Sequence, residues 1–523
     1  MKKKFLLIGL AAFFFVGMLF ATFPTVSEAI PPFARKYKTA CTTCHWGTFP
    51  KLNAFGRAFF ANGLRMPGGG DEVFVKEEPV KMGAPAWSKL FPKAVWPGSI
   101  PHLPAIGFKM VSEFAITRER PKNPRGGTLG SPERSQDTSF TGIESLEVLF
   151  GGTFGETLSF FGAGSIDELE RAYLNYAPYL FGEQGHFNFR FGRLDMRGTP
   201  MSSHRKQLSL SNYMMDVMPT ISAGNFFGFH PAQNGIEIWG SWNGPKGRGG
   251  FEWAAGIVNG ETGEGSELFD GSGDMDTIIT NMVGDDGVLG GIFGGEINKS
   301  KDWYVTVSYK IGGMGVLGEE SVDDSLAAKE NWRDDSVRIK GYYYRGVTGA
   351  YIDDPTSGAF GNPIDGGLFD SEANRFERFG VLVDANWRNF NFIGAASFME
   401  DDIKGTITYG AGTFGSNLAQ ESGSSFHTSI YTAELQCVVL PWLIPAVRVE
   451  NVNPDYDVRD IGSFTKYSFD ATIVPRANFK VVAGAHWSDY QDEQTGTDGN
   501  EADRVDLGSF LDTTYRLGVD IAF

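Results

Sequence analysis

The chain has 523 residues with 21% charged side chains, a formal net charge of −17, 68 glycines and only three cysteines. A protein this acidic repels nucleic acid, so we expect no nucleic-acid partner. Three cysteines in such a length exclude a disulfide scaffold, even in an exported protein where disulfides can form.

The first 29 residues are typical of a secretory signal peptide. Lys2–Lys4 form a basic start, an uncharged stretch runs from Phe5 to Phe23, and the small residues Ser27 and Ala29 suit signal peptidase. We therefore expect export and cleavage after Ala29, which removes two net positive charges and leaves a still more acidic mature chain. An uncleaved anchor is the competing interpretation, because the apolar stretch is long enough to cross a bilayer.

Residues 30–100 are predicted to form a small separate domain with a proline-rich connector. A short helix is expected from Lys51 to Asn62, ended by Gly63. Four prolines between residues 92 and 104 then disfavour any compact helix or strand. We place this domain on the periplasmic side of a membrane barrel or inside its lumen.

From about residue 105 onward, apolar and polar side chains alternate in segments of strand length, which is typical of transmembrane barrel strands. In the last segment one face carries Tyr515, Leu517, Val519, Ile521 and Phe523, and the other carries Arg516, Gly518, Asp520 and Ala522. The alternation recurs at 186–191, 378–386 and 466–473. A single such strand would also fit a soluble β-sandwich. Repetition, with many charges in the polar rows, favours a barrel with a wet lumen.

Short turns and longer loops alternate along this region, as they do in outer-membrane barrels. Turns are expected near 153–155, 181–184, 243–249, 387–389, 438–442 and 475–478, and loops at 120–138, 194–232, 260–300, 346–373, 400–424 and 490–512. Two links break the rule, since 166–168 is short for a loop and 313–335 is long for a turn. The predicted fold class is all-β, a transmembrane antiparallel β-barrel over residues 101–523. About sixteen strands fit the chain length, with both ends periplasmic, although fourteen or eighteen also fit.

Cys41, Cys44 and His45 form the motif that carries chemistry, in the stretch TACTTCHWGTFPKLNAFG. Cys-x-x-Cys-His attaches c-type haem, because both thiols can add to vinyl groups of one porphyrin and the adjacent imidazole can ligate its iron. A zinc site would require a second pair of ligands near Cys41 and Cys44 in the sequence, and none follows. A redox-active cysteine pair would require a thioredoxin-like fold of alternating strands and helices, which the flanking sequence does not predict. A plain structural disulfide is the remaining alternative.

Met66 is the predicted distal ligand of the haem iron. It follows the expected helix and precedes a glycine run that could fold it back, and methionine ligation would raise the reduction potential. Met82 and His102 are the local alternatives. Each of the three also suits a purely structural role, as an apolar filler or a surface histidine.

Several other residues invite weaker hypotheses. Cys437 lies on the apolar face of its segment and is predicted to be a small lipid-facing residue. His186 and His486 lie on polar rows, where they could line an electron or ion path or simply be polar wall residues. The acidic pairs 334–335 and 353–354 could bind ferrous iron or be solvated loop charge. Catalytic residues stay unassigned.

The stretch PPFARKYKTACTTCHWGTFPKLNAFGRAFFANGLRMPGG, with a barrel behind it, resembles the fused monohaem cytochrome-porins of bacterial outer membranes. The best-known members of that family are iron oxidases. The motif-specific resemblance is confined to the N-terminal domain, and the remainder matches in architecture only. It implies one covalent haem c on Cys41 and Cys44, with His45 as proximal ligand, in a protein surrounded by outer-membrane lipid.

The resemblance implies an electron conduit through the outer membrane. The hydrocarbon core is about 30 Å thick, so one haem cannot span it, but a haem domain in the lumen would stand between the two sides. The first hypothesis is oxidation of extracellular Fe(II) or another metal, with electrons passed to a periplasmic c-type cytochrome or other carrier. The alternatives are a solute porin with a docking or gating cytochrome domain, and outward electron transfer to extracellular metal. The sequence leaves open whether the protein is an Fe(II):cytochrome c oxidoreductase or a simple electron carrier.

Overall fold

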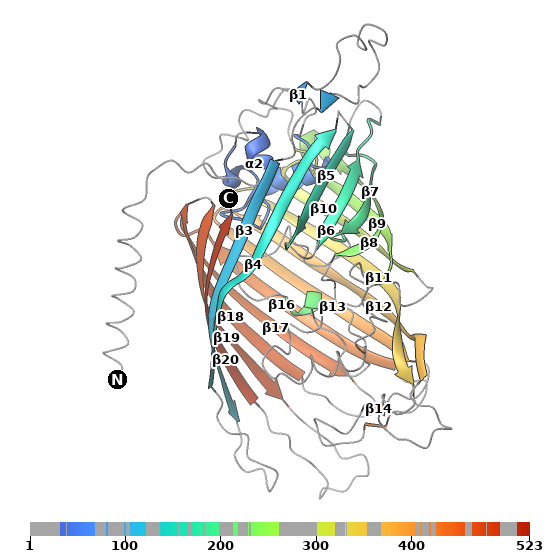
Figure 1. Cartoon of the computed structure of the whole chain (residues 1–523), viewed down its shortest axis with the longest axis vertical. Coiled ribbons are helices and arrows are strands. Elements are labelled where there is room, and N and C mark those ends of the chain that lie inside the picture. Colours follow the sequence, from blue (N-terminus) through green and yellow to red (C-terminus); the bar gives the residue numbers. More distant parts are fainter. Residues whose placement is uncertain are drawn as a thin grey trace, which may run out of the picture.

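Sixteen strands close into one antiparallel barrel, in which each strand pairs with its neighbours in chain order and β20 pairs with β3 (Figure 1). The predicted fold class and strand number are therefore confirmed, and closure leaves no strand edge of this sheet unpaired. The computed structural model describes residues 32–37, 39–67, 80–81, 99–100, 105–121, 136–154, 157–165, 170–180, 184–197, 213–217, 229, 232–260, 301–318, 330, 332–352, 368–403, 408–409, 418–419, 425–455, 463–476, 478–491 and 510–522.

The barrel strands begin at residue 105, where the alternating pattern of the sequence begins. They are β3 (Ala105–Pro121), β4 (Gln136–Phe154), β5 (Leu158–Gly164), β6 (Arg171–Tyr176), β7 (Asn188–Leu194), β8 (Gln233–Asn243), β9 (Arg248–Val258), β10 (Asp302–Met314), β11 (Ser336–Ile352), β12 (Leu368–Trp387), β13 (Phe390–Ile403), β16 (Ser425–Cys437), β17 (Leu443–Asp455), β18 (Ser463–Arg476), β19 (Phe479–Gln491) and β20 (Phe510–Ala522).

The remaining described elements are short. They are α2 (Pro32–Tyr37), η1 (Cys41–Thr43), α3 (Ala54–Ala61), α6 (Met214–Val217), η3 (Pro245–Gly247), and the paired strands β1 (Val80–Lys81) with β2 (Ser99–Ile100) and β14 (Thr408–Tyr409) with β15 (Leu418–Ala419). No helix within the described ranges is both long and apolar enough to cross a membrane.

The alternation in the sequence is the inside–outside alternation of the barrel wall. On β20, Tyr515 and Leu517 are each 47% exposed, whereas Asp520 and Ala522 are buried. The outward row of β10 is likewise apolar and exposed, from Val305 to Ile311. A continuous apolar belt around a closed barrel is stable against lipid and unfavourable against water. The fold is therefore a porin-like β-barrel of the outer-membrane type.

The inward rows bury charged residues that pair with each other. Arg378 and Asp401 lie 2.9 Å apart, as do Arg190 and Glu237, and all four side chains are at most 1% exposed. Pairing offsets the cost of removing such charges from water. The charges that the sequence places in its polar rows thus line the lumen.

Short connections gather at one end of the barrel and long ones at the other, as predicted. We call these the turn end, where α2 lies, and the loop end, where β14 lies (Figure 1). Each predicted turn falls between strands at the turn end. The alternation also holds at the two links that break the length rule, since β5 ends and β6 begins at the loop end, and β10 ends and β11 begins at the turn end. β3 begins and β20 ends at the turn end.

The described part of the connection between β7 and β8 enters the lumen. Tyr213 Oη donates to Glu434 on β16 at 3.0 Å, and the Met214 amide donates to Glu450 on β17 at 2.9 Å. These strands lie almost halfway round the ring from β7 and β8. Tyr213 and Met214 therefore lie inside the lumen, against strands far round the ring from those that the connection joins.

Candidate functional site at the turn end

Residues 39–67, which we call the plug, lie inside the barrel at its turn end and carry the predicted haem motif. Cys41–Thr43 form the single turn η1, and the amides of Cys44 and His45 donate to the Cys41 carbonyl at 3.1 and 3.0 Å. Residues three apart eclipse each other in such a turn, so Cys41 and Cys44 lie on one side of it. Both are free thiols. The structure thus brings the two cysteines together without a disulfide between them.

Asn53 joins this motif to helix α3. Its side-chain Nδ2 donates to the Thr43 carbonyl at 3.0 Å, while its Oδ1 caps the helix by accepting from the Gly56 amide at 2.9 Å. The cap explains why α3 begins at Ala54, three residues later than predicted. A Cβ at Gly56 would lie 2.1 Å from the Cys44 carbonyl oxygen, so only glycine lets the helix approach the motif this closely.

His45 is half-buried, and its surroundings favour the neutral imidazole. Burial lowers the pKa of His45 to about 4. Its Nδ1 lies 3.2 Å from the Pro50 carbonyl oxygen, and because a carbonyl only accepts, Nδ1 must be the donor. This tautomer leaves Nε2 as the ring's lone-pair nitrogen, which is the arrangement of a metal-ligating histidine oriented by a backbone carbonyl.

Met66 lies in the same apolar cluster as the motif. The cluster is formed by Tyr37, Phe55, Phe59, Phe60, Leu64, Met66, Tyr173 and Leu194, with Cys44 and Leu52 packed against it. Positive φ angles at Gly63 and Leu64 turn the chain back after α3, and Met66 is only 3% exposed. This turn lies before Met66, whereas the glycine run expected to fold Met66 back, residues 68–70, lies outside the described residues. Met82 and His102, the alternative ligands, lie outside the described residues.

The donor set fits a c-type haem. Two free thiols share one side of a turn, a neutral imidazole follows directly, and an apolar cluster that contains a methionine adjoins them. If haem is attached, Cys41 and Cys44 would hold it and His45 would ligate its iron, which would supply a one-electron carrier. Within the described ranges, no three His, Cys, Asp or Glu side chains gather as a second metal-binding group.

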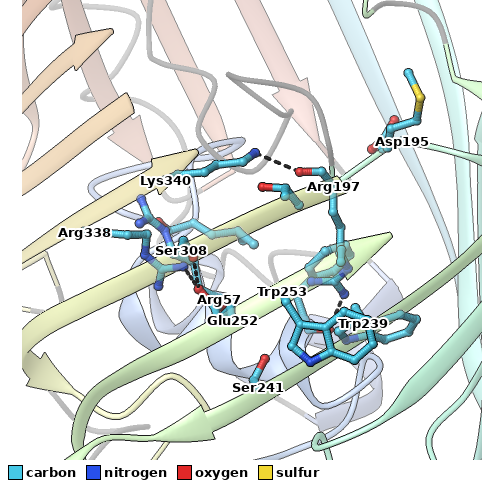
Figure 2. Close-up of a pocket in the computed structure, with 15 residues that line it drawn as sticks. Arg57, Asp195, Arg197, Trp239, Ser241, Glu252, Trp253, Ser308, Arg338 and Lys340 are labelled. Atoms are coloured by element: carbon cyan, nitrogen blue, oxygen red, sulfur yellow. Dashed lines mark hydrogen bonds and ion pairs between the residues drawn. The ribbon is translucent and has the colours of Figure 1, made fainter. Parts of the chain in front are cut away.

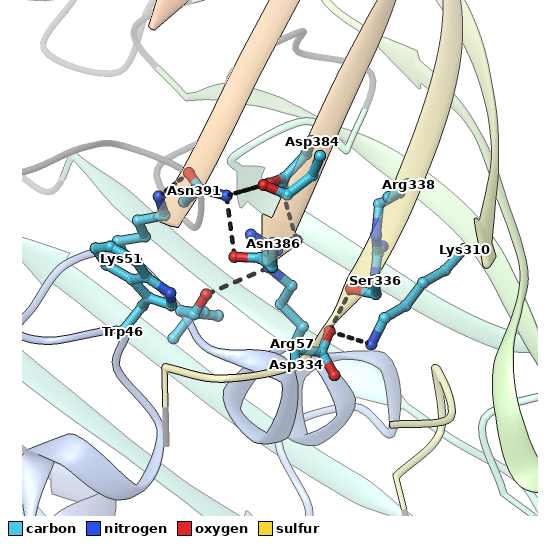
Figure 3. Close-up of polar contacts among 12 residues, drawn as sticks. Trp46, Lys51, Arg57, Lys310, Asp334, Ser336, Arg338, Asp384, Asn386 and Asn391 are labelled. Carbon is cyan, nitrogen blue, oxygen red and sulfur yellow. Dashed lines mark hydrogen bonds and ion pairs between the residues drawn. The ribbon is translucent and has the colours of Figure 1, made fainter. Parts of the chain in front are cut away.

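Polar contacts seat the plug against one side of the wall (Figure 3). Lys51 is fully buried and its Nζ donates to Asn391 on β13 and, at 2.8 Å, to Gln436 on β16. Arg57 pairs with Asp384 on β12 at 2.7 Å. These partners all belong to inward polar rows, so the wall presents acceptors where the plug presents cations.

Further contacts seat the plug against the rest of the ring. Trp239 Nε1 on β8 donates to the Ala61 carbonyl at 3.1 Å, and Lys480 on β19 donates to the Phe49 carbonyl at 3.1 Å. The Arg197 guanidinium lies over the rings of Phe60 and Trp239, at 4.1 and 4.3 Å. Because the plug touches β8, β12, β13, β16 and β19, it is held from several sides of the lumen.

The other predicted candidates take positions in the wall. Cys437 continues the outward row of β16, as predicted, and His486 lies inside at 3.1 Å from Asp470. His186 Nδ1 lies 2.9 Å from the Ser241 carbonyl oxygen. Asp334 pairs with Lys310 at 2.7 Å, so it is a structural residue of the turn end and is not solvated loop charge. Asp353 and Asp354 lie outside the described residues.

Sequence reasoning missed the wall residues that receive the plug and the inner loop. In the sequence these residues are ordinary members of polar rows, and nothing near them indicates a partner hundreds of positions away. They are Asp384, Asn391, Gln436, Glu434 and Glu450. Only their inward direction could be predicted.

Comparisons with known proteins find solved structures with a similar barrel and no similar sequence. No protein-family model and no curated protein sequence matches the chain. Among solved structures, OmpT of Vibrio cholerae in its trimer form matches at 9% identity and TM-score 0.41, covering 81% of this chain and 100% of that one. An anion-selective porin from Comamonas acidovorans matches at 9% and 0.42, covering 80% and 100%. Salmonella typhi OmpF in complex with daunomycin matches at 12% and 0.39, covering 80% and 97%. The assignment of the fold rests on the strand pairing and the apolar belt described above.

Proposed function

We propose that this protein is an outer-membrane electron conduit, in which a monohaem cytochrome plug sits in a porin-like barrel. The proposed direction runs from extracellular Fe(II) to a periplasmic one-electron carrier. One observation carries the proposal: the Cys41–Cys44–His45 motif lies inside the barrel, on a plug bound to the wall by buried polar contacts. A redox group on that plug would be fixed within the membrane protein and not tethered beside it.

The length of the path supports a site inside the barrel. The hydrocarbon core is about 30 Å thick, too far for one haem outside the lumen to reach. In outer-membrane barrels the short turns face the periplasm, so the plug at the turn end would meet a periplasmic carrier. Extracellular metal would approach through the loop end.

The chain's own residues would bind, orient and shield the redox group. Cys41 and Cys44 would anchor it, and the carbonyl of Pro50 would orient the His45 ring. The apolar cluster around Phe59 and Met66 would exclude water. Fe(II) would lose one electron and become Fe(III), and the carrier on the periplasmic side would take up that electron.

The test is optical spectroscopy of the full-length protein in liposomes, produced in a host that attaches c-type haem. We expect covalent haem on a denaturing gel, absent from Cys41→Ala/Cys44→Ala, and reduction of that haem by Fe(II) added outside. A protein without covalent haem would refute the conduit. A haem protein that Fe(II) leaves oxidised would refute the substrate while keeping the cytochrome.

A solute porin is the second candidate, since the fold itself is that of a porin. The contacts of the plug with five strands argue against a wide pore at the turn end. Planar-bilayer conductance separates the two: large steady channels from the intact protein would favour the porin. Outward electron transfer is the third candidate, and oxidation of the pre-reduced haem by extracellular Fe(III), without reduction by Fe(II), would favour it.

A further inference from the structure

A short loop of the plug, residues 46–51, orients the His45 ring, and we call it the orienting loop. Its two ends meet, because the Trp46 amide donates to the Lys51 carbonyl at 2.8 Å. This closure brings the Pro50 carbonyl to His45 Nδ1 at 3.2 Å, and the backbone of Lys51 also interacts with the imidazole. The orientation of the ring therefore depends on where the loop lies.

Lys51 fixes the end of the orienting loop to two neighbouring strands of the wall (Figure 3). Its side chain is fully buried, and Nζ donates to Asn391 on β13 and, at 2.8 Å, to Gln436 on β16. The carboxylates of Asp384 and Glu434 stabilise its positive charge from nearby. A buried ammonium loses these hydrogen bonds if it moves, so this end of the loop stays with the wall.

The wall also holds the start and the middle of the orienting loop. Lys480 on β19 donates from Nζ to the Phe49 carbonyl at 3.1 Å, and the same Nζ lies 4.8 Å from the centre of the Phe49 ring. Trp46 is 2% exposed and packs against Val438 and Ile444, which adjoin the turn between β16 and β17. Strands from β13 round to β19 therefore hold the loop along its length.

The plug is packed less closely against strands β8 to β11. A cavity of about 80 Å³ lies there between the plug and the wall (Figure 2). Leu52, Arg57 and Phe60 line it on the plug side, whereas no residue of the orienting loop does. A cavity supplies no packing contacts. The contacts that fix the orienting loop are therefore those with β13, β16 and β19.

We propose that the barrel wall positions the proximal haem ligand, His45. Lys51 and Lys480 are the positioning residues, and they act by holding the loop whose Pro50 carbonyl orients the ring. This inference rests on the proposed function, because it takes His45 as the ligand of a haem iron. A carbonyl that accepts from Nδ1 makes the imidazole a stronger electron donor to a metal on Nε2. A stronger donor favours the oxidised metal, so an intact hold on the loop would lower the reduction potential.

The first experiment measures the hold on the loop without haem. Hydrogen exchange is followed in the full-length protein with both motif cysteines replaced by alanine, before and after adding Lys51→Met. Losing charge-assisted hydrogen bonds should speed exchange of the Trp46 amide about ten- to a hundred-fold. Ser159→Ala is the control and should leave that amide unchanged, because it removes a buried contact of β5 with the Gly63 carbonyl, beyond α3. Equal exchange in Lys51→Met and its parent overturns the proposal.

The second experiment measures the reduction potential of the haem-loaded protein. Gln436→Met removes an acceptor of Lys51 without changing any charge, so the potential should rise while the covalent haem stays on a denaturing gel. Gln436 also donates to Glu434. Tyr213→Phe is therefore the matched control, because it removes another donor to Glu434 and leaves Lys51 with both acceptors. Its potential should equal that of the wild type.

The outcomes separate this inference from the proposed function. A higher potential in Gln436→Met, with Tyr213→Phe unchanged, supports positioning of the ligand by the wall. An unchanged or lower potential in Gln436→Met, with covalent haem present, overturns the inference and leaves the conduit standing. A wild type without covalent haem refutes the proposed function and the inference together, whatever the exchange experiment shows about the loop.

Discussion

Arg57 of the plug helix α3 and Asp384 of the wall strand β12 form an ion pair of 2.7 Å, and the Asp384 carboxylate is completely shielded from solvent (Figure 3). Asn391 Nδ2 also donates to Asp384, at 2.7 Å, and the adjoining Asn391 Oδ1 accepts from Lys51. One small polar network therefore links two plug cations to neighbouring wall strands. It makes the seating of the plug sensitive to single substitutions.

Arg57→Met should loosen the plug. Removing one member of a buried pair leaves an uncompensated charge and typically costs about 3–5 kcal/mol. We expect the free energy of local opening of α3, measured by hydrogen exchange of its amides, to fall by about that amount. Adding Asp384→Asn should restore part of the loss, because it removes the stranded charge. Unchanged exchange of α3 in Arg57→Met would show that the pair does not hold the plug.

A surface pair provides the matched control. Arg345 and Glu377 lie 3.7 Å apart with side chains 47% and 35% exposed. Exposed pairs contribute about 1 kcal/mol or less, so Arg345→Met should leave the exchange of α3 unchanged.

Asp334 should make the turn end sensitive to acid. Burial alone would raise the pKa of Asp334, but Lys310 and hydrogen bonds from Ser336 and Met314 outweigh burial and hold it below its ordinary value of 3.8. The unfolded carboxyl therefore binds a proton more readily than the folded one. The stabilisation is complete above the ordinary pKa and is lost as the pH falls through the lower folded value.

The measurement is the pH dependence of hydrogen exchange at the described residues 314–318 and 332–335. In the wild type, opening should increase as the pH falls below the ordinary carboxyl pKa. Asp334→Asn should already be open at neutral pH and show a flatter acid limb. An equally steep acid response in this variant would assign the effect to another carboxyl.

The barrel could be predicted from the sequence because lipid imposes a strict rule. Each strand must satisfy its backbone through its neighbours and turn alternate side chains outward, so a row such as Tyr515 and Leu517 opposite Arg516 and Asp520 has one stable placement. Turns could be placed for the same reason, since strand length is set by the membrane.

The seat of the plug could not be predicted, because it depends on which strands the closed ring brings together. Lys51 donates a hydrogen bond to Gln436, which lies 385 positions further along the sequence, and no residue near either of them indicates this contact. Asp334 shows the opposite case. The sequence suggests an exposed acidic pair at 334–335, but the Asp334 side chain is only 10% exposed and is paired with Lys310 at the turn end. The Cys-x-x-Cys-His motif can be identified without tertiary knowledge, because it depends on local spacing alone, and the haem that it predicts stays a prediction.

Val307→Arg tests which face of the wall meets lipid. Val307 is 48% exposed in the middle of β10, between Val305 and Tyr309 on the same outward row. An arginine near the bilayer midplane of a barrel costs about 2–4 kcal/mol. Urea unfolding in lipid vesicles should show that loss, with Val307→Leu as the control. A change of less than about 1 kcal/mol would place this row outside the hydrocarbon core.

Met66→Leu tests the distal ligand while sparing the points of attachment. Leucine keeps the apolar volume of a side chain that is 3% exposed, so the plug should stay folded and the covalent haem should remain on a denaturing gel. If the Met66 sulfur ligates iron, its loss should lower the reduction potential, because thioether ligation raises it. Met196→Leu is the control, since Met196 is equally buried but packs in the separate aromatic cluster around Tyr304 and Phe376. Equal potentials in the wild type and both variants would remove Met66 from the iron and direct the search to Met82 and His102.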